Sequence, residues 1–309
     1  MQVFWHILVN NTIPLGVMIA IGMILQRVFR LDIRTLSKLN FYLFSPAMMF
    51  KMLYESKISA AVLFQVLLFF FVFIGLLALL VELVVRLRGY SAGMRSAMRN
   101  SVLFYNSGNY AIPLNQLVFA NNPFTLSIQI IISMMQSLLP NTYGVYSVNS
   151  HRMSFDKTLK TILGMPVIYA IPLAFLLRGF SVPIPSPLYT PLNYIADGFI
   201  VTALVTLGVQ LGAMKWTLRL GDVLISNALR LLAGPALGWL IVWLMGFEGE
   251  MAAALIVSCA VPTSLTSVLL AVEFDNEPEF ASQAVFASTA FSMITMTAVI
   301  YLLHSSFVF

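Results

Sequence analysis

Charged side chains are scarce in this sequence. Lysine, arginine, aspartate and glutamate together make up 9% of its 309 residues, whereas hydrophobic residues make up 60%. Soluble globular proteins carry roughly 25% charged residues, which they need to cover their surface. Disordered chains are excluded as well, because they are poor in aromatic residues and this chain contains 24 Phe. The composition therefore predicts a membrane protein with several transmembrane segments.

A second cysteine and a basic leader are also missing. Cys259 is the sole cysteine, so an intramolecular disulfide is impossible. The residues from Met1 to Asn11 include no lysine or arginine, whereas a cleavable signal peptide begins with a basic region. We therefore expect the first apolar segment to be retained as a helix.

Catalytic motifs are absent too. The sequence contains no His-Glu-x-x-His zinc pair, no glycine-rich phosphate loop and no nucleophile elbow. We therefore expect a protein that is not an enzyme and that has no cofactor or metal site. An intramembrane lipid-modifying enzyme is the alternative of a different class.

Long apolar runs dominate what is present. A helix needs about 20 apolar residues to cross the hydrocarbon core, and the sequence offers ten such runs: 5–28, 36–54, 60–85, 99–119, 125–149, 160–178, 190–213, 222–245, 250–272 and 280–304. The runs are continuous and longer than the ~10 residues of a membrane-barrel strand. They predict an all-α fold with ten transmembrane helices.

The basic residues predict how these helices are oriented. Cytoplasmic loops are enriched in lysine and arginine. With the N-terminus outside, thirteen of the 17 basic residues lie on the inner side: Arg27, Arg30, Arg34, Lys38, Arg86, Arg88, Arg95, Arg99, Arg152, Lys157, Lys160, Lys215 and Arg219. We therefore expect a multi-pass protein of the cell (inner) membrane with both termini extracytoplasmic. This distribution accounts for the net charge of +5, so a nucleic-acid partner is not expected.

The ten runs divide into two halves. Five precede the inner connection at 150–160 and five follow it, so repeats at 1–150 and 151–309 would have opposite topology. Inverted repeats are typical of secondary transporters. A local match supports them, since Ala111-Ile112-Pro113 and Ala260-Val261-Pro262 both fall in the fourth run of their half.

Both matching segments should interrupt their helices. Irregular backbone at membrane depth is tolerated where protein or a watery cavity satisfies it. A proline favours the first turn of a helix, so each break should start a new half-helix whose amide end attracts anions. The candidate substrate-binding residues here are Asn106, Gly108, Asn109, Pro113, Asn115, Pro262, Thr263 and Ser264. The alternative is a packing kink, which we expect at the other prolines within the runs: Pro14, Pro46, Pro140, Pro166, Pro172 and Pro235.

The segment at 106–113 reads Asn-Ser-Gly-Asn-Tyr-Ala-Ile-Pro. It resembles the Asn-x-Gly-Asn-x-Gly-x-Pro signature of the auxin efflux carrier family, which includes bacterial malonate and malate permeases and plant PIN-type exporters. Segments 39–50, 207–211, 260–263 and 277–279 also resemble that family. Ala111 departs from the signature, since the family often has glycine there.

The resemblance implies two inverted five-helix repeats with crossing broken helices 4 and 9, and organic anions as substrates. It also implies an elevator-type mechanism, in which helices 3–5 and 8–10 move against a scaffold of helices 1–2 and 6–7, and a homodimer through that scaffold. The chain lacks a long hydrophilic central loop, which favours the bacterial permeases. An asparagine on the fifth helix approaches the crossover in this family, so Asn141 is a further candidate contact; a helix–helix hydrogen bond is the alternative.

Charged side chains inside the membrane are the remaining candidates for a functional role. Asp197 could carry a coupling proton or face an outer water pocket. Arg230 could pair with a substrate carboxylate or extend to the inner surface. Residues 101–117 and 255–270 contain no carboxylate, whereas sodium sites commonly include one. We therefore expect sodium-independent transport, with a sodium-coupled symporter resembling the bile acid symporters as the alternative.

Overall fold

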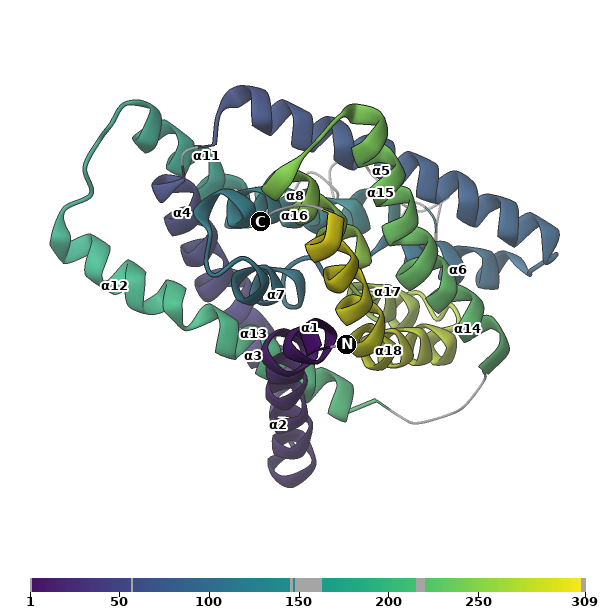
Figure 1. The fold of residues 1–309 in the computed structure, drawn as a ribbon. Coiled ribbons are helices and arrows are strands. Elements are labelled where there is room, and N and C mark those ends of the chain that lie inside the picture. The colour runs from purple at the N-terminus through teal and green to yellow at the C-terminus, as the bar shows by residue number, and fades with distance from the viewer. Residues whose placement is uncertain (1, 57, 145–146, 148–162, 215–219, 307–309) are drawn as a thin grey trace.

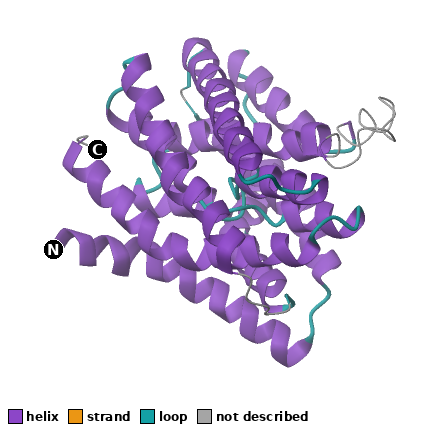
Figure 2. Ribbon diagram, turned by 90° about the vertical axis from the view of Figure 1, so that its right-hand side faces the viewer, coloured by secondary structure: helices purple, strands orange, loops and turns teal. Residues whose placement is uncertain are grey.

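The computed structural model describes residues 2–56, 58–144, 147, 163–214 and 220–306. Every secondary-structure element named in this part of the chain is a helix. Figure 2 shows them as one bundle joined by short loops. The predicted all-α fold is therefore confirmed. The predicted inner connection at 150–160 lies outside the described residues.

By length and composition, five of the described helices can cross a membrane: Phe4–Phe29, Ala60–Leu87, Ser186–Gly212, Gly221–Met245 and Pro278–Ser306. Each overlaps one of the predicted runs. Three shorter apolar helices overlap three more runs: Pro123–Leu139, Val167–Gly179 and Gly249–Ala260. The count of ten spans stays a prediction.

Two predicted runs are interrupted helices. The first comprises α6 (Ala92–Leu103) and α7 (Ala111–Val118), and the second comprises α16 (Gly249–Ala260) and α17 (Thr266–Glu273). In both, a half-helix of 12 residues is followed by one of 8 residues. At 1.5 Å per residue, each break begins about 18 Å along its helix, near the middle of a hydrocarbon core of about 30 Å.

Three other helices each contain a π-turn just before a proline. They are α1–η1–α2 (Gln2–Ile7, Leu8–Thr12, Ile13–Phe29), α3–η2–α4 (Ile33–Leu39, Asn40–Phe44, Ser45–Glu55) and α14–η4–α15 (Leu220–Ala228, Leu229–Ala233, Gly234–Met245). Each π-turn ends two residues before a proline, namely Pro14, Pro46 or Pro235. Proline has no amide hydrogen for the carbonyl four residues earlier, and the amide just before it bonds five residues back instead, as Ser45 does with Asn40. The expected packing kinks at these prolines are therefore π-turns.

The remaining elements complete the bundle: α5 (Ala60–Leu87), α8 (Pro123–Leu139), η3 (Pro140–Gly144), α11 (Val167–Gly179), α12 (Ser186–Asp197), α13 (Phe199–Gly212) and α18 (Pro278–Ser306). Figure 1 shows α4, α11 and α12 on one side of the molecule, α6 and α14 on the other, and α5 running across from one side to the other. The start of α1 and the end of α18 lie on the same side of the bundle (Figure 2).

Helices α2 and α13 pack through glycines. A Cβ atom at Gly208 would lie 2.0 Å from the carbonyl oxygen of Ile19 and 2.8 Å from the Cα atom of Gly22. A Cβ atom at Gly22 would lie 2.3 Å from the carbonyl oxygen of Val205. Small residues let membrane helices approach backbone to backbone, so these two glycines set the distance between α2 and α13.

Candidate functional site

The two breaks pair with each other through their backbones. The Asn106 amide donates a hydrogen bond of 2.8 Å to the carbonyl of Pro262, and the Ser264 amide donates one of 2.8 Å to the carbonyl of Phe104. Tyr105 and Thr263 form an antiparallel bridge between these bonds. Unwound backbone at membrane depth needs such partners, and here each break supplies them to the other. The two breaks therefore meet here, as the predicted crossing requires, and we call this pairing of residues 104–106 with residues 262–264 the crossover.

The prediction that a proline opens each second half-helix is correct for one break and wrong for the other. Pro113 is the third residue of α7. Pro262 lies in the extended segment between α16 and α17, four residues before α17 begins at Thr266. Thr263 keeps this segment extended: its hydroxyl donates to the Ser101 carbonyl at 2.7 Å, and its amide donates to the Ser288 hydroxyl at 3.1 Å.

A cavity of about 750 Å³ lies beside the crossover. It brings together four of the predicted substrate residues, Asn106, Gly108, Asn109 and Ser264. Helices α3, η2, α8 and α13 supply much of the remaining wall, including polar side chains that no sequence motif singles out: Ser37, Asn40, Ser133, Gln136, Thr206 and Gln210.

Four other predicted residues lie outside this cavity wall. Pro113, Asn115, Pro262 and Thr263 are buried in the packing around the crossover. Asn115 joins α7 to α8, because its side-chain oxygen accepts a 3.0 Å hydrogen bond from the Thr125 hydroxyl. Asn141 follows Pro140, which lines the cavity, but the Asn141 side chain lies outside the described part of the structure.

The first break offers the cavity donors and few acceptors. All six carbonyls from Leu103 to Gly108 accept a hydrogen bond, two of them from the side chains of Gln129 and Gln136 on α8. In contrast, the amides of Gly108 and Asn109 donate to no group among the described residues. The Asn109 side-chain oxygen accepts a 3.0 Å hydrogen bond from Asn40. This part of the wall therefore carries two free amide donors.

Lys38 adds a full positive charge to the wall. It lies in the last turn of α3 and is the one charged side chain among the described residues that line the cavity. Asp32 caps the first turn of the same helix by accepting the Thr35 hydroxyl at 2.5 Å, which lowers the pKa of the Asp32 carboxyl. The charge distribution predicts Lys38 as one of the inner-loop charges. No feature of the sequence indicated that it faces a site.

Asp197 lies away from this cavity. Its carboxylate forms an ion pair of 3.0 Å with Lys51, which joins α12 to α4, and its side chain is 68% exposed. Asp197 does not line the cavity, so the structure gives it no contact with the crossover among the described residues, and its two sequence interpretations, a coupling proton or an outer water pocket, stay predictions.

Arg230 matches neither of its two interpretations. Its side chain is fully buried and donates to the carbonyls of Val102 and Cys259. It therefore neither extends to the inner surface nor lines the cavity.

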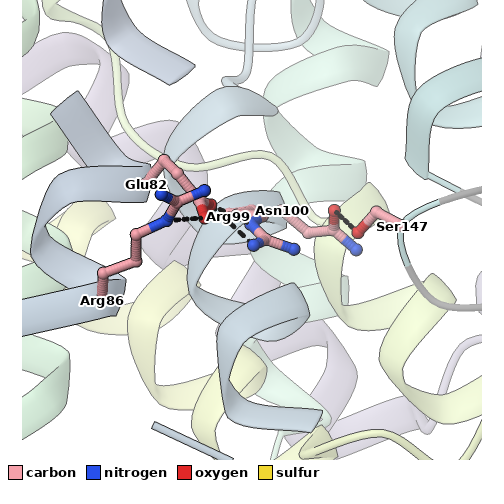
Figure 3. A network of polar contacts seen from close by, with 5 residues as sticks. All are labelled: Glu82, Arg86, Arg99, Asn100 and Ser147. Atoms are coloured by element: carbon pink, nitrogen blue, oxygen red, sulfur yellow. Dashed lines mark hydrogen bonds and ion pairs between the residues drawn. The ribbon is translucent and has the colours of Figure 1, made fainter. Parts of the chain in front are cut away.

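A polar network ties α5 to α6 (Figure 3). Glu82 accepts hydrogen bonds from Arg86 at 2.8 Å and from Arg99 at 2.6 Å. Arg86 lies one turn from Glu82 on the same helix, whereas Arg99 contributes from α6, so the Glu82 carboxylate links the two helices. Beside it, Ser147 donates to the Asn100 side chain at 3.1 Å (Figure 3). Within the described residues, no group of three His, Cys, Asp or Glu side chains could hold a metal ion.

Two interrupted helices paired over a polar cavity, in a bundle of long apolar helices, are the architecture of a membrane transport protein. A family model described as membrane transport protein matches residues 32–300. The chain therefore belongs to this family, the auxin efflux carrier family.

The chain is also similar to a protein described as an uncharacterized transporter from Methanothermobacter thermautotrophicus. The two are 22% identical over 269 residues, which cover 86% of this chain and 87% of that relative. The resemblance drawn from the 106–113 segment is thus confirmed. Membership of a transporter family is also consistent with a protein that is not an enzyme.

Proposed function

We propose that the protein carries small organic anions, carboxylates such as malonate, malate or auxin-like acids, across the cell's inner membrane as a secondary or facilitative transporter. The observation that carries this proposal is the polarity of the cavity wall at the crossover. Its carbonyls from Leu103 to Gly108 are already bonded, its amides at Gly108 and Asn109 are free among the described groups, and Lys38 supplies a cation. Such a wall attracts a carboxylate.

The helix lengths support two inverted repeats, at 1–150 and 151–309. The interrupted helix of each half consists of 12 residues followed by 8. Two halves with five spans each would carry these helices into the membrane from opposite sides. Their breaks then meet at equal depth, as the paired backbones require.

The packing supports an elevator-type mechanism. Helix α2 packs closely on α13, and α4 on α11 and α12, within the group that the family resemblance assigns to the scaffold. The other group, α5–α8 and α14–α18, is tied together by the crossover itself. The hydrogen bond from Asn40 to Asn109 joins the two groups, so it would break as they slide. From the resemblance we also propose a homodimer through the scaffold helices.

The cavity corresponds to an inward-facing state. Lys38 and Gly164, both in its wall, belong to helix ends that the positive-inside distribution assigns to the cytoplasm. The substrate would therefore exchange with the cytoplasm in this conformation.

Removing the Asn109 side chain should weaken substrate binding and uptake by about tenfold, since one or two hydrogen bonds are worth about 1.4 kcal/mol. The measurement is uptake of labelled malonate, malate and an aromatic acid into proteoliposomes, with an anion-dependent melting shift as the binding readout. Asn10→Ala is the matched control, because Asn10 is an exposed asparagine in η1. Wild-type uptake by Asn109→Ala would refute a substrate role for the crossover. Chemical change of the acid would instead favour an enzyme.

The orientation has its own test. In a Cys259→Ser background, cysteines placed at Asn121 or Glu248 should react with an impermeant thiol reagent applied to intact cells, whereas a cysteine at Ser91 should react after permeabilisation alone. The first two positions lie in loops at the predicted outer side, and the third lies between α5 and α6 at the basic side. Labelling of position 91 in intact cells would reverse the proposed orientation.

A further inference from the structure

Arg230 is a buried cation without a carboxylate. Its side chain has 0% exposure, and none of the ion pairs among the described residues includes it. One guanidinium nitrogen donates to the Val102 carbonyl at 3.3 Å and another to the Cys259 carbonyl. The guanidinium also lies 4.5 Å from the centre of the Tyr105 ring and 5.8 Å from that of Phe73. Such a burial is costly unless something compensates the charge.

The two carbonyls identify the compensating groups. Val102 is in the last turn of α6, which ends at Leu103, and Cys259 is in the last turn of α16, which ends at Ala260. The C-terminus of a helix carries a partial charge of about −0.5. Two such ends meet at Arg230, and together they offer about one negative charge to its one positive charge. The guanidinium therefore neutralises the carbonyl ends of both interrupted helices at once.

Local structure delivers the guanidinium to this point. Arg230 is the second residue of the π-turn η4, which precedes Pro235. Gly234 leaves the necessary room, since a Cβ atom there would lie 2.9 Å from the Cys259 carbonyl oxygen and 3.0 Å from Nη2 of Arg230. Gly238, one turn later, lets α15 approach Cys259 closely. The π-turn, Gly234 and Gly238 therefore all serve the contact between Arg230 and the crossover.

We propose that Arg230 is the resident cation of the crossover, in the position where a coupling sodium ion would bind in a sodium-driven carrier. Half-helix carbonyl ends and unwound carbonyls are the groups that coordinate sodium in transporters with interrupted helices. Here a covalently attached guanidinium holds two of them permanently. It is a positioning residue, because it holds α6 and α16 together without contacting the cavity. Transport then needs no metal cation at this place.

The role of Arg230 in coupling rests on the proposed transport function. The experiment that tests it does not, because it measures melting temperature. Wild-type protein, Arg230→Ala, Arg230→Lys and Arg230→Met are purified in detergent. Each is melted in choline chloride, in sodium chloride and in choline chloride with added methylguanidinium. Arg95→Ala is the matched control, because Arg95 is an exposed arginine on α6.

Wild-type protein and Arg95→Ala should melt at the same temperature in all three solutions. Arg230→Ala should melt lower in choline and recover by several degrees with sodium or methylguanidinium, because a cation that binds the folded state alone stabilises it. Indifference of Arg230→Ala to both cations, or a sodium requirement in the wild type, would overturn the proposal.

If Arg230→Ala fails to fold, the proposal is tested by comparing Arg230→Lys with Arg230→Met. Arg230→Lys should melt well above Arg230→Met, because lysine keeps the charge and methionine keeps mainly the bulk. Equal melting temperatures would overturn the proposal. If the cation effect holds but no tested acid is transported by the wild type, the transport proposal fails and the inference stands.

Discussion

Replacing Gly208 by alanine should destabilise the protein by about 3 kcal/mol or more, beyond the usual cost of overpacking. The added Cβ atom would lie 2.0 Å from the carbonyl oxygen of Ile19 and 2.8 Å from the Cα atom of Gly22. Both neighbours are backbone, so no side-chain rotation relieves the contact. Helices α2 and α13 must separate along their length, and the packing that joins them is lost. The measurement is the melting temperature in detergent together with the yield of monodisperse protein.

Gly75 provides the matched control. It also lies within a long apolar helix, α5, but a Cβ atom there would meet nothing within 4 Å. Gly75→Ala should leave the melting temperature unchanged or raise it slightly, because alanine favours a helix by about 1 kcal/mol over glycine. Equal melting of the two variants would contradict the close packing of α2 and α13.

Reversing the charge of Lys38 should abolish transport. Lys38→Glu replaces the cation of the cavity wall with an anion, so the substrate meets repulsion where it met attraction. At an effective dielectric of about 20, two unit charges 4 Å apart interact by about 4 kcal/mol, so uptake should fall by more than a hundredfold. Lys38→Gln should reduce apparent affinity for the acid with a smaller loss of maximal rate. Initial uptake rates across a range of substrate concentrations separate these effects.

Arg34→Glu makes the same charge change on the same helix, α3, but Arg34 does not line the cavity. It should transport nearly as the wild type does, with its orientation and yield preserved. Near-normal uptake by Lys38→Glu would remove Lys38 from the site and leave the crossover amides to account for anion selectivity.

The chemistry of the breaks was predictable because it depends on residues close in sequence. Asn106, Gly108, Asn109 and Pro113 stand within eight positions of an apolar run, and an unwound segment follows from that pattern. The meeting of the two breaks was implied by the family resemblance, whereas the need of unwound backbone for partners left both protein and a watery cavity open. The start of α17 was not, because the hydroxyl and amide of Thr263 bind partners on other helices, Ser101 and Ser288.

Residues whose role depends on distant helices could not be assigned. Lys38 lines the cavity from α3, which packs on α13, and Asn40 binds Asn109 from 69 positions away. Arg230 is a charged residue within an apolar run, which indicates a functional or structural role but does not indicate which groups it contacts. Its partners are backbone carbonyls, which every residue possesses, so no side-chain pattern in the sequence could indicate them.

The π-turns before Pro14, Pro46 and Pro235 have a consequence for how each helix meets its neighbours. One additional residue in a turn rotates everything beyond it by about 100° relative to a continuous α-helix. The apolar stripe therefore changes direction partway along the helix. Accordingly, α1 packs on α18 whereas α2 packs on α13, and α14 packs on α18 whereas α15 packs on α16 and α5. One transmembrane helix thus presents two differently oriented apolar faces, each to its own set of neighbouring helices. A search for helical periodicity that spans the π-turn combines the two faces and detects neither.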